Sequence, residues 1–177
     1  MKKLLPGSLF ALVMIALGTW VFLRSGFFPI AASSKPDMLD DLAPQMRDHA
    51  IARHARAVTS LPGSAGPESI ARGLTHYREN CMPCHGAPDG SAAEFSAGLN
   101  PGPPPLEIEK VQARSDTELF WIVKNGLRMT GMPAFNVNHK DDEIADIVRF
   151  VRHLPQLTAE EKALLSAPPA GDDHHHH

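Results

Sequence analysis

Cys81-Met82-Pro83-Cys84-His85 is the stretch of this sequence that decides its fold, and it contains both cysteines of the chain. The spacing Cys-x-x-Cys-His is typical of covalent attachment of a c-type haem. Two thiols three positions apart can form thioether bonds with the two vinyl groups of one porphyrin. The histidine that follows is then placed against one face of the iron. The motif therefore predicts a bound haem.

Two other kinds of site use paired cysteines, and the rest of the chain disfavours both. A thioredoxin-like redox disulfide needs a βαβ context. Aromatic residues are few here and β-branched residues rarely alternate, which favours an all-α protein instead. A structural zinc site commonly needs four ligands, and the chain has no second pair of cysteines to supply them.

The net charge of −3 conceals an uneven distribution along the chain. The first 35 residues contain four basic side chains and no acidic one, whereas residues 36–177 carry 13 basic and 20 acidic side chains. This acidic balance argues against nucleic acid as a partner, because phosphate binding needs a basic face. It fits ordinary solubility, or electrostatic steering towards a partner with a basic patch.

An apolar segment runs from Leu4 to Leu23, directly after Lys2 and Lys3. Twenty helical residues span about 30 Å, the thickness of the hydrocarbon core of a bilayer. The lysines before it, against Arg24 alone behind it, predict a single-pass anchor with the N-terminus inside and the rest outside. A cleaved signal peptide is the alternative. Its cleavage site, Ala31-Ala32-Ser33, would lie unusually far beyond the apolar run.

A helical arm is predicted after the anchor. Residues 37–60 are rich in helix formers, and Pro44 is expected to break or restart the helix. Five side chains recur at helical spacing in this stretch: Leu39, Leu42, Met46, His49 and Arg53. A free stalk and an arm packed on the following domain both fit this pattern. His54 is the histidine of interest if the arm folds over a site, and residues 61–66 form a linker.

Three main helices and a short terminal one are predicted beyond the linker. The first runs from Pro67 to about Asn80, with the proline in its first turn. The second begins at the capping box Ser115–Glu118 and ends at Gly126. The third begins between His139 and Asp142 and ends at Pro155, and Thr158 caps the terminal helix. Proline-rich residues 100–106 and residues 127–138 are expected to be loops.

A porphyrin-bound iron has two axial positions, and His85 can fill only one of them. Met132 is the best candidate for the other, because it lies in a loop that Pro133 stiffens. Met129, three residues earlier, represents the alternative that a loop methionine merely fills the core. A His/Met pair gives the iron a higher potential than two nitrogen donors and leaves no open position, which favours electron transfer over oxygen chemistry.

Several separated motifs between Pro67 and Pro155 resemble those of class I c-type cytochromes. They are Gly73-x-x-x-Tyr77, Cys81-x-x-Cys84-His85-Gly86, Pro104-Pro105-Leu106, Lys124-Asn125-Gly126, Gly131-Met132-Pro133-Ala134-Phe135 and Ile147-Val148-Arg149-Phe150-Val151. The arrangement is most similar to membrane-anchored monohaem cytochromes c of bacteria. The domain also resembles those attached to terminal oxidases and periplasmic dehydrogenases. The resemblance leaves the role of residues 37–66 open.

The resemblance implies one covalently bound haem c. Cys81 and Cys84 would carry the thioethers, His85 would be the proximal iron ligand and Met132 the distal one. By position, the Pro104 carbonyl would accept a hydrogen bond from the proximal histidine. Trp121 and Phe135 would form walls of the haem pocket. Gly73 and Tyr77 would pack against Ile147 and Phe150 where the first helix crosses the last.

The implied architecture is all-α: a class I cytochrome c fold with three main helices around the haem, preceded by one transmembrane helix and the arm. We expect an anchor and exit at residues 1–33, the arm and linker at 34–66, the cytochrome c domain with the short terminal helix at 67–166, and a disordered tail ending in histidines at 167–177.

The resemblance also implies a function. It predicts a single-pass protein of the bacterial inner membrane that carries electrons between redox proteins of the periplasm or inner membrane, with its haem domain in the periplasm. Enzymatic activity, a small-molecule substrate and nucleic acid are not expected. One alternative is a fixed haem subunit of a larger membrane oxidoreductase complex. Another is a haem sensor or enzyme in which the Met132 bond is labile.

Overall fold

The computed structural model describes residues 4–27, 30–34, 38–88, 90 and 92–167. Lys2, Lys3 and the predicted tail from residue 168 onwards therefore lie outside the described residues. The chain divides into two compact units, Met1–Lys35 and Pro36–His177. Within the described ranges the structure contains helices and turns but no strand, so the predicted all-α class is confirmed.

Helix α1 (Leu4–Arg24) makes up most of the first unit. Residues Gly7–Arg24 have a mean hydropathy of 1.8, and none of this span is buried. Among the described residues, α1 is the helix that is long and apolar enough to cross a membrane. It coincides with the apolar segment from which the anchor was predicted.

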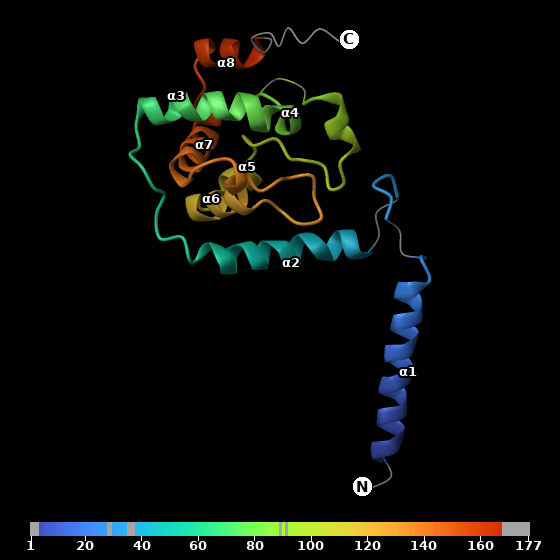
Figure 1. Ribbon diagram of the computed structural model, residues 1–177. Helices are drawn as coiled ribbons and strands as arrows, with labels where there is room; N and C mark the ends of the chain where they lie inside the picture. Colours follow the sequence, from blue (N-terminus) through green and yellow to red (C-terminus); the bar gives the residue numbers. More distant parts are fainter. Residues whose placement is uncertain (1–3, 28–29, 35–37, 89, 91, 168–177) are drawn as a thin grey trace. The chain divides into compact units, whose positions relative to one another are not determined.

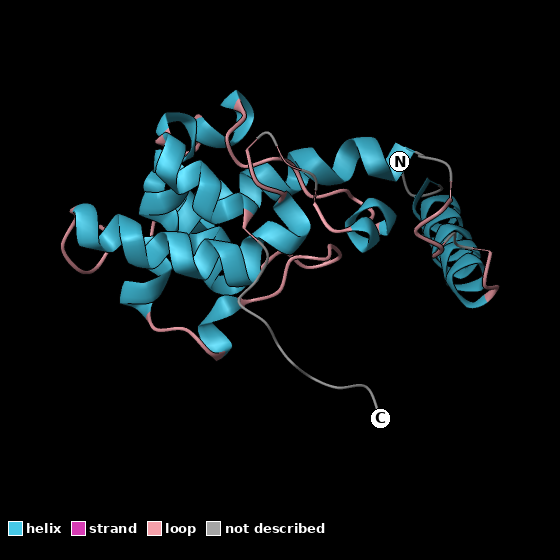
Figure 2. Cartoon of the chain, turned by 90° about the horizontal axis from the view of Figure 1, so that it is seen from above, coloured by secondary structure: helices cyan, strands magenta, loops and turns pink. Residues whose placement is uncertain are grey.

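The second unit is built around α7 (Asp141–His153), which packs against both α3 (Pro67–His76) and α6 (Asp116–Asn125). Helix α2 (Met38–Ala55) packs on α6, as Figure 1 shows along the edge of the domain. The remaining segments are short: α4 (Met82–His85), α5 (Glu109–Gln112), α8 (Ala159–Ser166), a π-helical turn (Tyr77–Cys81) and 3₁₀ turns at Glu94–Gly98, Phe135–Val137 and Leu154–Gln156. Figure 2 shows that loops connect these helices throughout.

The crossing of α3 and α7 depends on Gly73. A Cβ atom at this position would lie 2.2 Å from the carbonyl oxygen of Asp146 and 2.7 Å from Cβ of Phe150. The rings of Tyr77 and Phe150 meet one turn further on, with their centroids 5.3 Å apart. Tyr77, Ile147 and Phe150 are completely buried. The predicted packing of the first helix on the last is therefore present.

The local start and stop signals in the sequence fix the ends of α6 and α8. The side chain of Ser115 accepts a hydrogen bond from the Glu118 amide, and Glu118 reaches back to the Ser115 amide. Thr158 and Glu161 form the same reciprocal pair before α8. Gly126, with φ of 65°, ends α6. These predicted boundaries are confirmed.

The region around the cysteine motif differs from the prediction. The first helix was expected to continue regularly to about Asn80, but α3 ends at His76 and a π-helical turn follows. In this turn the Met82 amide donates to the carbonyl of Tyr77, five residues back. The extra residue in the turn rotates Cys81 and the helix α4 relative to α3. Such π-helical turns are frequent at functional sites.

The arm also corrects a prediction. Pro44 neither breaks nor restarts α2, which is a single helix. A proline in a helix interior removes one backbone hydrogen bond. Because tertiary packing supplies most of the stability of a protein helix, α2 tolerates this loss. Its second half is fixed to the domain, since Ile51 and Ala55 are buried and Asp48 pairs with Arg114.

Candidate functional site

The two thiols lie on consecutive turns at the junction between the π-helical turn and α4. Cys81 is 7 % exposed, Cys84 is half-buried, and neither forms a disulfide. Residues three apart on a helix point to the same side, so both sulfur atoms can face one ligand. Burial, reinforced by the neighbouring Cys84, raises the pKa of the Cys81 thiol to about 12. The thiol is therefore protonated at neutral pH.

A hydrogen bond fixes the tautomer of His85. Its Nδ1 atom lies 2.7 Å from the carbonyl oxygen of Pro104. A carbonyl oxygen only accepts, so Nδ1 must carry the proton and Nε2 keeps its lone pair. Burial lowers the pKa of His85, while the hydrogen bond to Pro104 acts in the opposite direction. The ring is thus held neutral, with one nitrogen able to bind a metal.

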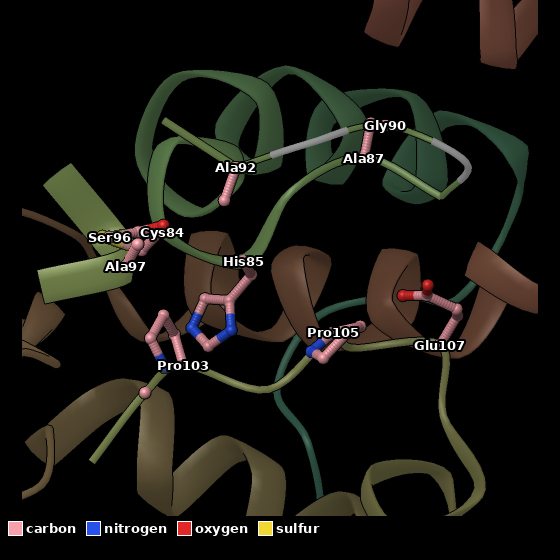
Figure 3. A pocket seen from close by; sticks show the side chains of 11 residues that line it. Cys84, His85, Ala87, Gly90, Ala92, Ser96, Ala97, Pro103, Pro105 and Glu107 are labelled. Carbon is pink, nitrogen blue, oxygen red and sulfur yellow. The ribbon is translucent and has the colours of Figure 1, made fainter. Parts of the chain in front are cut away.

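A cavity of about 520 Å³ lies beside Cys84 and His85. Figure 3 shows the imidazole of His85 pointing from its helix toward the loop that carries Pro103 and Pro105. Most of the other side chains around the cavity are small; the lining comprises Ala87, Gly90, Ala92, Ser96, Ala97, Gly102, Pro103, Pro105 and Glu107. Because these side chains are small, the cavity has room for a flat ligand next to the imidazole.

Two hydrogen bonds hold the backbone around the motif. The hydroxyl of Tyr77 donates to the carbonyl of Gly86 at 2.6 Å. Burial raises the pKa of Tyr77, which keeps this hydroxyl protonated and able to donate. On the other side, the amide of Ala93 donates to the carbonyl of Pro83 at 2.9 Å. Sequence reasoning gave Tyr77 a packing role only, since nothing in the local pattern links its hydroxyl to a residue nine positions later.

The loop that carries Met132 is closed on itself by Thr130. The Thr130 hydroxyl donates to the carbonyl of Leu127 at 2.6 Å and accepts from the Met132 amide at 3.1 Å. The amide of Leu127 donates back to the carbonyl of Met132 at 3.2 Å. The sequence offered no sign of this role, because Thr130 is an ordinary residue for a loop.

The two methionines of this loop have different environments. Met132 is half-buried and packs against the hydrophobic core. Met129 is 85 % exposed and has a left-handed backbone, with φ of 58°. Met129 therefore fills no part of the core, and Met132 is the methionine that the loop directs inward.

Close backbone contacts place this loop. A Cβ atom on Gly126 would lie 2.6 Å from the carbonyl carbon of Pro133, so the end of α6 and the residues after Met132 approach each other without a side chain between them. A Cβ atom on Gly131 would lie 2.9 Å from the methyl groups of Leu99. The Met132 loop is thereby held between α6 and the segment that follows the 3₁₀ turn at Glu94–Gly98.

The two aromatic residues expected to wall the haem have different neighbours. Phe135 is buried in the core, with the ring of His139 against its own ring at 5.5 Å. Trp121 is half-buried and stacks on His54 of the arm, with centroids 5.4 Å apart and planes at 12°. Met132, Trp121 and Phe135 are not among the residues that line the cavity beside His85. Their contacts to haem stay predictions.

The competing zinc interpretation finds no ligand set among the described residues. In the described part of the chain, no group of three or more histidine, cysteine, aspartate or glutamate side chains could hold a metal ion. The donor set instead fits a covalently held haem. Two unpaired thiols lie on the same side of consecutive turns, a neutral imidazole keeps Nε2 available, and a cavity bordered by small residues adjoins them.

Comparison with known families gives an independent result. Residues 68–151 match the family model described as cytochrome c oxidase, cbb3-type, subunit III. The matched span begins in α3, contains the cysteine motif and the Met132 loop, and ends in α7. No curated protein matches the chain.

Proposed function

Because residues 68–151 form a domain of the class I c-type cytochrome family, we propose that this protein is a membrane-tethered monohaem electron carrier. The observation that carries the proposal is the hydrogen bond from His85 to Pro104, which leaves Nε2 free next to two unpaired thiols. Cys81 and Cys84 would hold one haem c through thioethers. His85 would be the proximal iron ligand, and the inward-directed Met132 the distal one.

Haem, when bound, would supply one-electron redox chemistry: its iron would be reduced by a donor protein and reoxidised by an acceptor protein. The chain would bind, orient and shield this group. Pro104 holds the His85 ring in one tautomer and orientation. Thr130 and Gly126 support the loop of Met132. If His85 and Met132 both bound the iron, the protein would leave it closed to a substrate, which suits electron transfer.

Helix α1 supports the tethering part of the proposal, because its length and apolar composition suit a bilayer. The positive charges before it favour a periplasmic location for the haem domain in the inner membrane of a bacterium. Tethering would raise the effective concentration of partners in the same membrane. These partners would be redox proteins of the periplasm or the membrane.

The ligation is tested with Met132→Ala and the matched control Met129→Ala, three residues away in the same loop. For Met132→Ala we expect loss of the methionine-to-iron charge-transfer band of the oxidised protein, a lower midpoint potential and binding of carbon monoxide to the reduced form. Met129→Ala should behave like the unaltered protein. A retained band in Met132→Ala would contradict the His/Met assignment. Carbon monoxide binding to the unaltered reduced protein at neutral pH would favour a sensor or enzyme.

A second candidate function is that of a fixed subunit in a membrane oxidoreductase. It is favoured by the matched family model, whose description names a subunit of an oxidase. Extraction in mild detergent followed by measurement of the particle mass separates the two functions. A single chain with its haem supports a free carrier, whereas a larger particle containing other redox subunits supports the complex.

A further inference from the structure

Helix α2 presents five side chains to solvent on the side away from the domain. We define its outer face as Met38, Leu42, Met46, His49 and Arg53, all of which are exposed. Met38 is 77 % exposed and Met46 62 % exposed. At roughly 100° per residue, these five positions fall within one narrow arc of the helix. The buried residues Ile51 and Ala55 lie roughly opposite and face α6.

Helical spacing along the sequence singles out Leu42, Met46, His49 and Arg53. In the structure these four side chains are exposed, and the residues that pack on α6 lie on the other side of the helix. In Figure 1, α6 adjoins α2 on one side only. The outer face therefore combines three large apolar side chains in its first half with two basic side chains, His49 and Arg53, in its second half. Exposed apolar side chains of this size can enter the headgroup boundary of a bilayer, and a guanidinium nearby can meet its phosphates.

The connection between α1 and α2 is short. Helix α1 ends at Arg24 and α2 begins at Met38, so residues 25–37 join them. A fully extended chain gains at most about 3.6 Å per residue, which limits this connection to about 50 Å. Two turns shorten it further, because the amide of Ser25 bonds to the carbonyl of Phe22 and that of Ser34 to Ala31. The connection also carries an exposed aromatic residue, Phe27 (82 % exposed).

We propose that the outer face of α2 lies on the surface of a phospholipid bilayer. Met38, Leu42 and Met46 enter the boundary between headgroups and acyl chains, and His49 and Arg53 reach the lipid phosphates. The inference rests on the proposed function, because α1 must be the membrane anchor that keeps α2 near the lipid. A tethered helix needs little buried area to stay adsorbed, since the anchor supplies its effective concentration.

A protein partner is the less suitable occupant of this face. A stable protein interface buries about 800 Å² on each side, contributed by about 20–30 residues. The outer face offers five residues along one helix. Asp40 and Asp41 in the first turn lie off the face, which favours zwitterionic over strongly acidic lipid. Because α2 also packs on α6, its adsorption would hold the side of the domain containing α6 toward the membrane.

The test uses the full haem-loaded chain in nanodiscs of phosphatidylcholine and phosphatidylethanolamine. A nitroxide label is placed at Met46→Cys, and a matched label at Leu164→Cys on an exposed position of α8. The accessibility of each label to oxygen, which concentrates in lipid, is compared with that to a water-soluble nickel chelate. We expect the oxygen-to-nickel ratio at position 46 to exceed that at position 164 several-fold.

A second label at His49→Cys should also show a high oxygen-to-nickel ratio, which means that it is protected from water. The triple variant Met38→Ser with Leu42→Ser and Met46→Ser should abolish this protection. The control changes Ala43→Ser and Ala50→Ser, which are exposed on α2 but lie off the outer face, and should leave the protection intact. Equal nickel access at positions 46 and 164 would overturn the inference. An undiminished oxygen-to-nickel ratio at position 49 in the triple variant would overturn it as well.

The same preparation separates failure of the inference from failure of the proposed function. If the chain does not remain with the nanodiscs, α1 is not an anchor, and both the tethering and the lipid contact of α2 are wrong. If the chain remains with the nanodiscs but the label at position 46 is open to water, the anchor stands and the lipid contact of α2 alone is wrong.

Discussion

At His85 one hydrogen bond decides which ring nitrogen is available to a metal. The carbonyl of Pro104 accepts a hydrogen bond from Nδ1–H, so Nε2 is the nitrogen that keeps its lone pair. The same carbonyl limits rotation of the ring. A proline at position 104 has no amide hydrogen, but its carbonyl remains a full acceptor. A single backbone oxygen from a distant loop thus prepares this side chain as a ligand.

Gly73 shows how strongly one residue can restrict a helix crossing. The change Gly73→Ala would place a methyl group against the backbone of Asp146, which cannot move aside as a flexible side chain could. We expect it to lower the free energy of unfolding by about 3 kcal/mol, the upper part of the range for overpacked cores. Urea denaturation followed by circular dichroism measures this.

Gly98→Ala is the matched control, because a Cβ atom there meets no heavy atom within 4 Å. We expect its free energy of unfolding to stay within about 0.5 kcal/mol of the unaltered protein. Equal stability of the Gly73→Ala and Gly98→Ala variants would show that α3 and α7 can separate without cost.

Among the elements, the end of α6 positions the proposed distal ligand. Gly126 has a positive φ and leaves no room for a side chain beside Pro133. Gly126→Ala should push the Met132 loop away while leaving the cysteine motif intact. We expect a haem-loaded protein whose charge-transfer band is weakened or lost, as judged by the absorption spectrum of the oxidised form. A variant with full haem content and an unchanged band would show that the loop does not depend on this contact.

The junction of α3, α7 and the linker contains a buried carboxylate. The side chain of Asp146 is 6 % exposed and accepts hydrogen bonds from Ser69, from Arg72 at 2.7 Å and from Arg149 at 3.1 Å. Arg149 also donates to the carbonyl of Pro62 at 2.7 Å. Burial alone would raise the pKa of Asp146, but the hydrogen bonds and the charge of Arg72 outweigh it, and the pKa is lowered.

A lowered pKa in the folded state means that ionised Asp146 stabilises the fold. This contribution is complete above the ordinary carboxyl pKa of about 3.9. It is lost as the pH falls from there through the lower pKa of Asp146 in the folded protein. Asp146→Asn should therefore lower the free energy of unfolding at pH 7, by about 3 kcal/mol, and flatten its decline between pH 5 and pH 2. Chemical denaturation across this range measures both effects. Asp142 is an exposed neighbour, and Asp142→Asn should keep the same decline of the free energy of unfolding with falling pH. An equally steep decline in Asp146→Asn would show that ionised Asp146 does not stabilise the fold.

At the scale of the whole molecule, we expect the stability of the fold to depend on the proposed haem. A chain that cannot attach haem would leave the cavity of about 520 Å³ beside His85 to solvent. We expect the double variant Cys81→Ser with Cys84→Ser to lose at least about 3 kcal/mol of stability, because a tightly held ligand stabilises only the folded state. Thermal unfolding followed by circular dichroism tests this.

The single variant Cys84→Ser is the control, since Cys81 could still form one thioether. It should melt between the unaltered protein and the double variant. If the haem-free double variant melts at the same temperature as the unaltered protein, the cavity is not essential to the fold.

The sequence by itself determined those features whose causes are local. The spacing of Cys81, Cys84 and His85 indicated the cofactor, and the capping pairs at Ser115 and Thr158 fixed where α6 and α8 begin. The apolar segment from Leu4 to Leu23 predicted α1. Each of these signals depends on residues within a few positions of one another, where backbone geometry alone brings them into contact.

Only the tertiary structure decided what depends on distant segments. It distinguished the half-buried Met132 from the exposed Met129, set the proton of His85 through a carbonyl 19 residues away, and packed α2 on α6 despite Pro44. It also left Leu42, Met46, His49 and Arg53 of α2 exposed. These outcomes depend on which side chains are buried together once distant segments pack. Helical spacing along one segment does not determine which face will contact another helix.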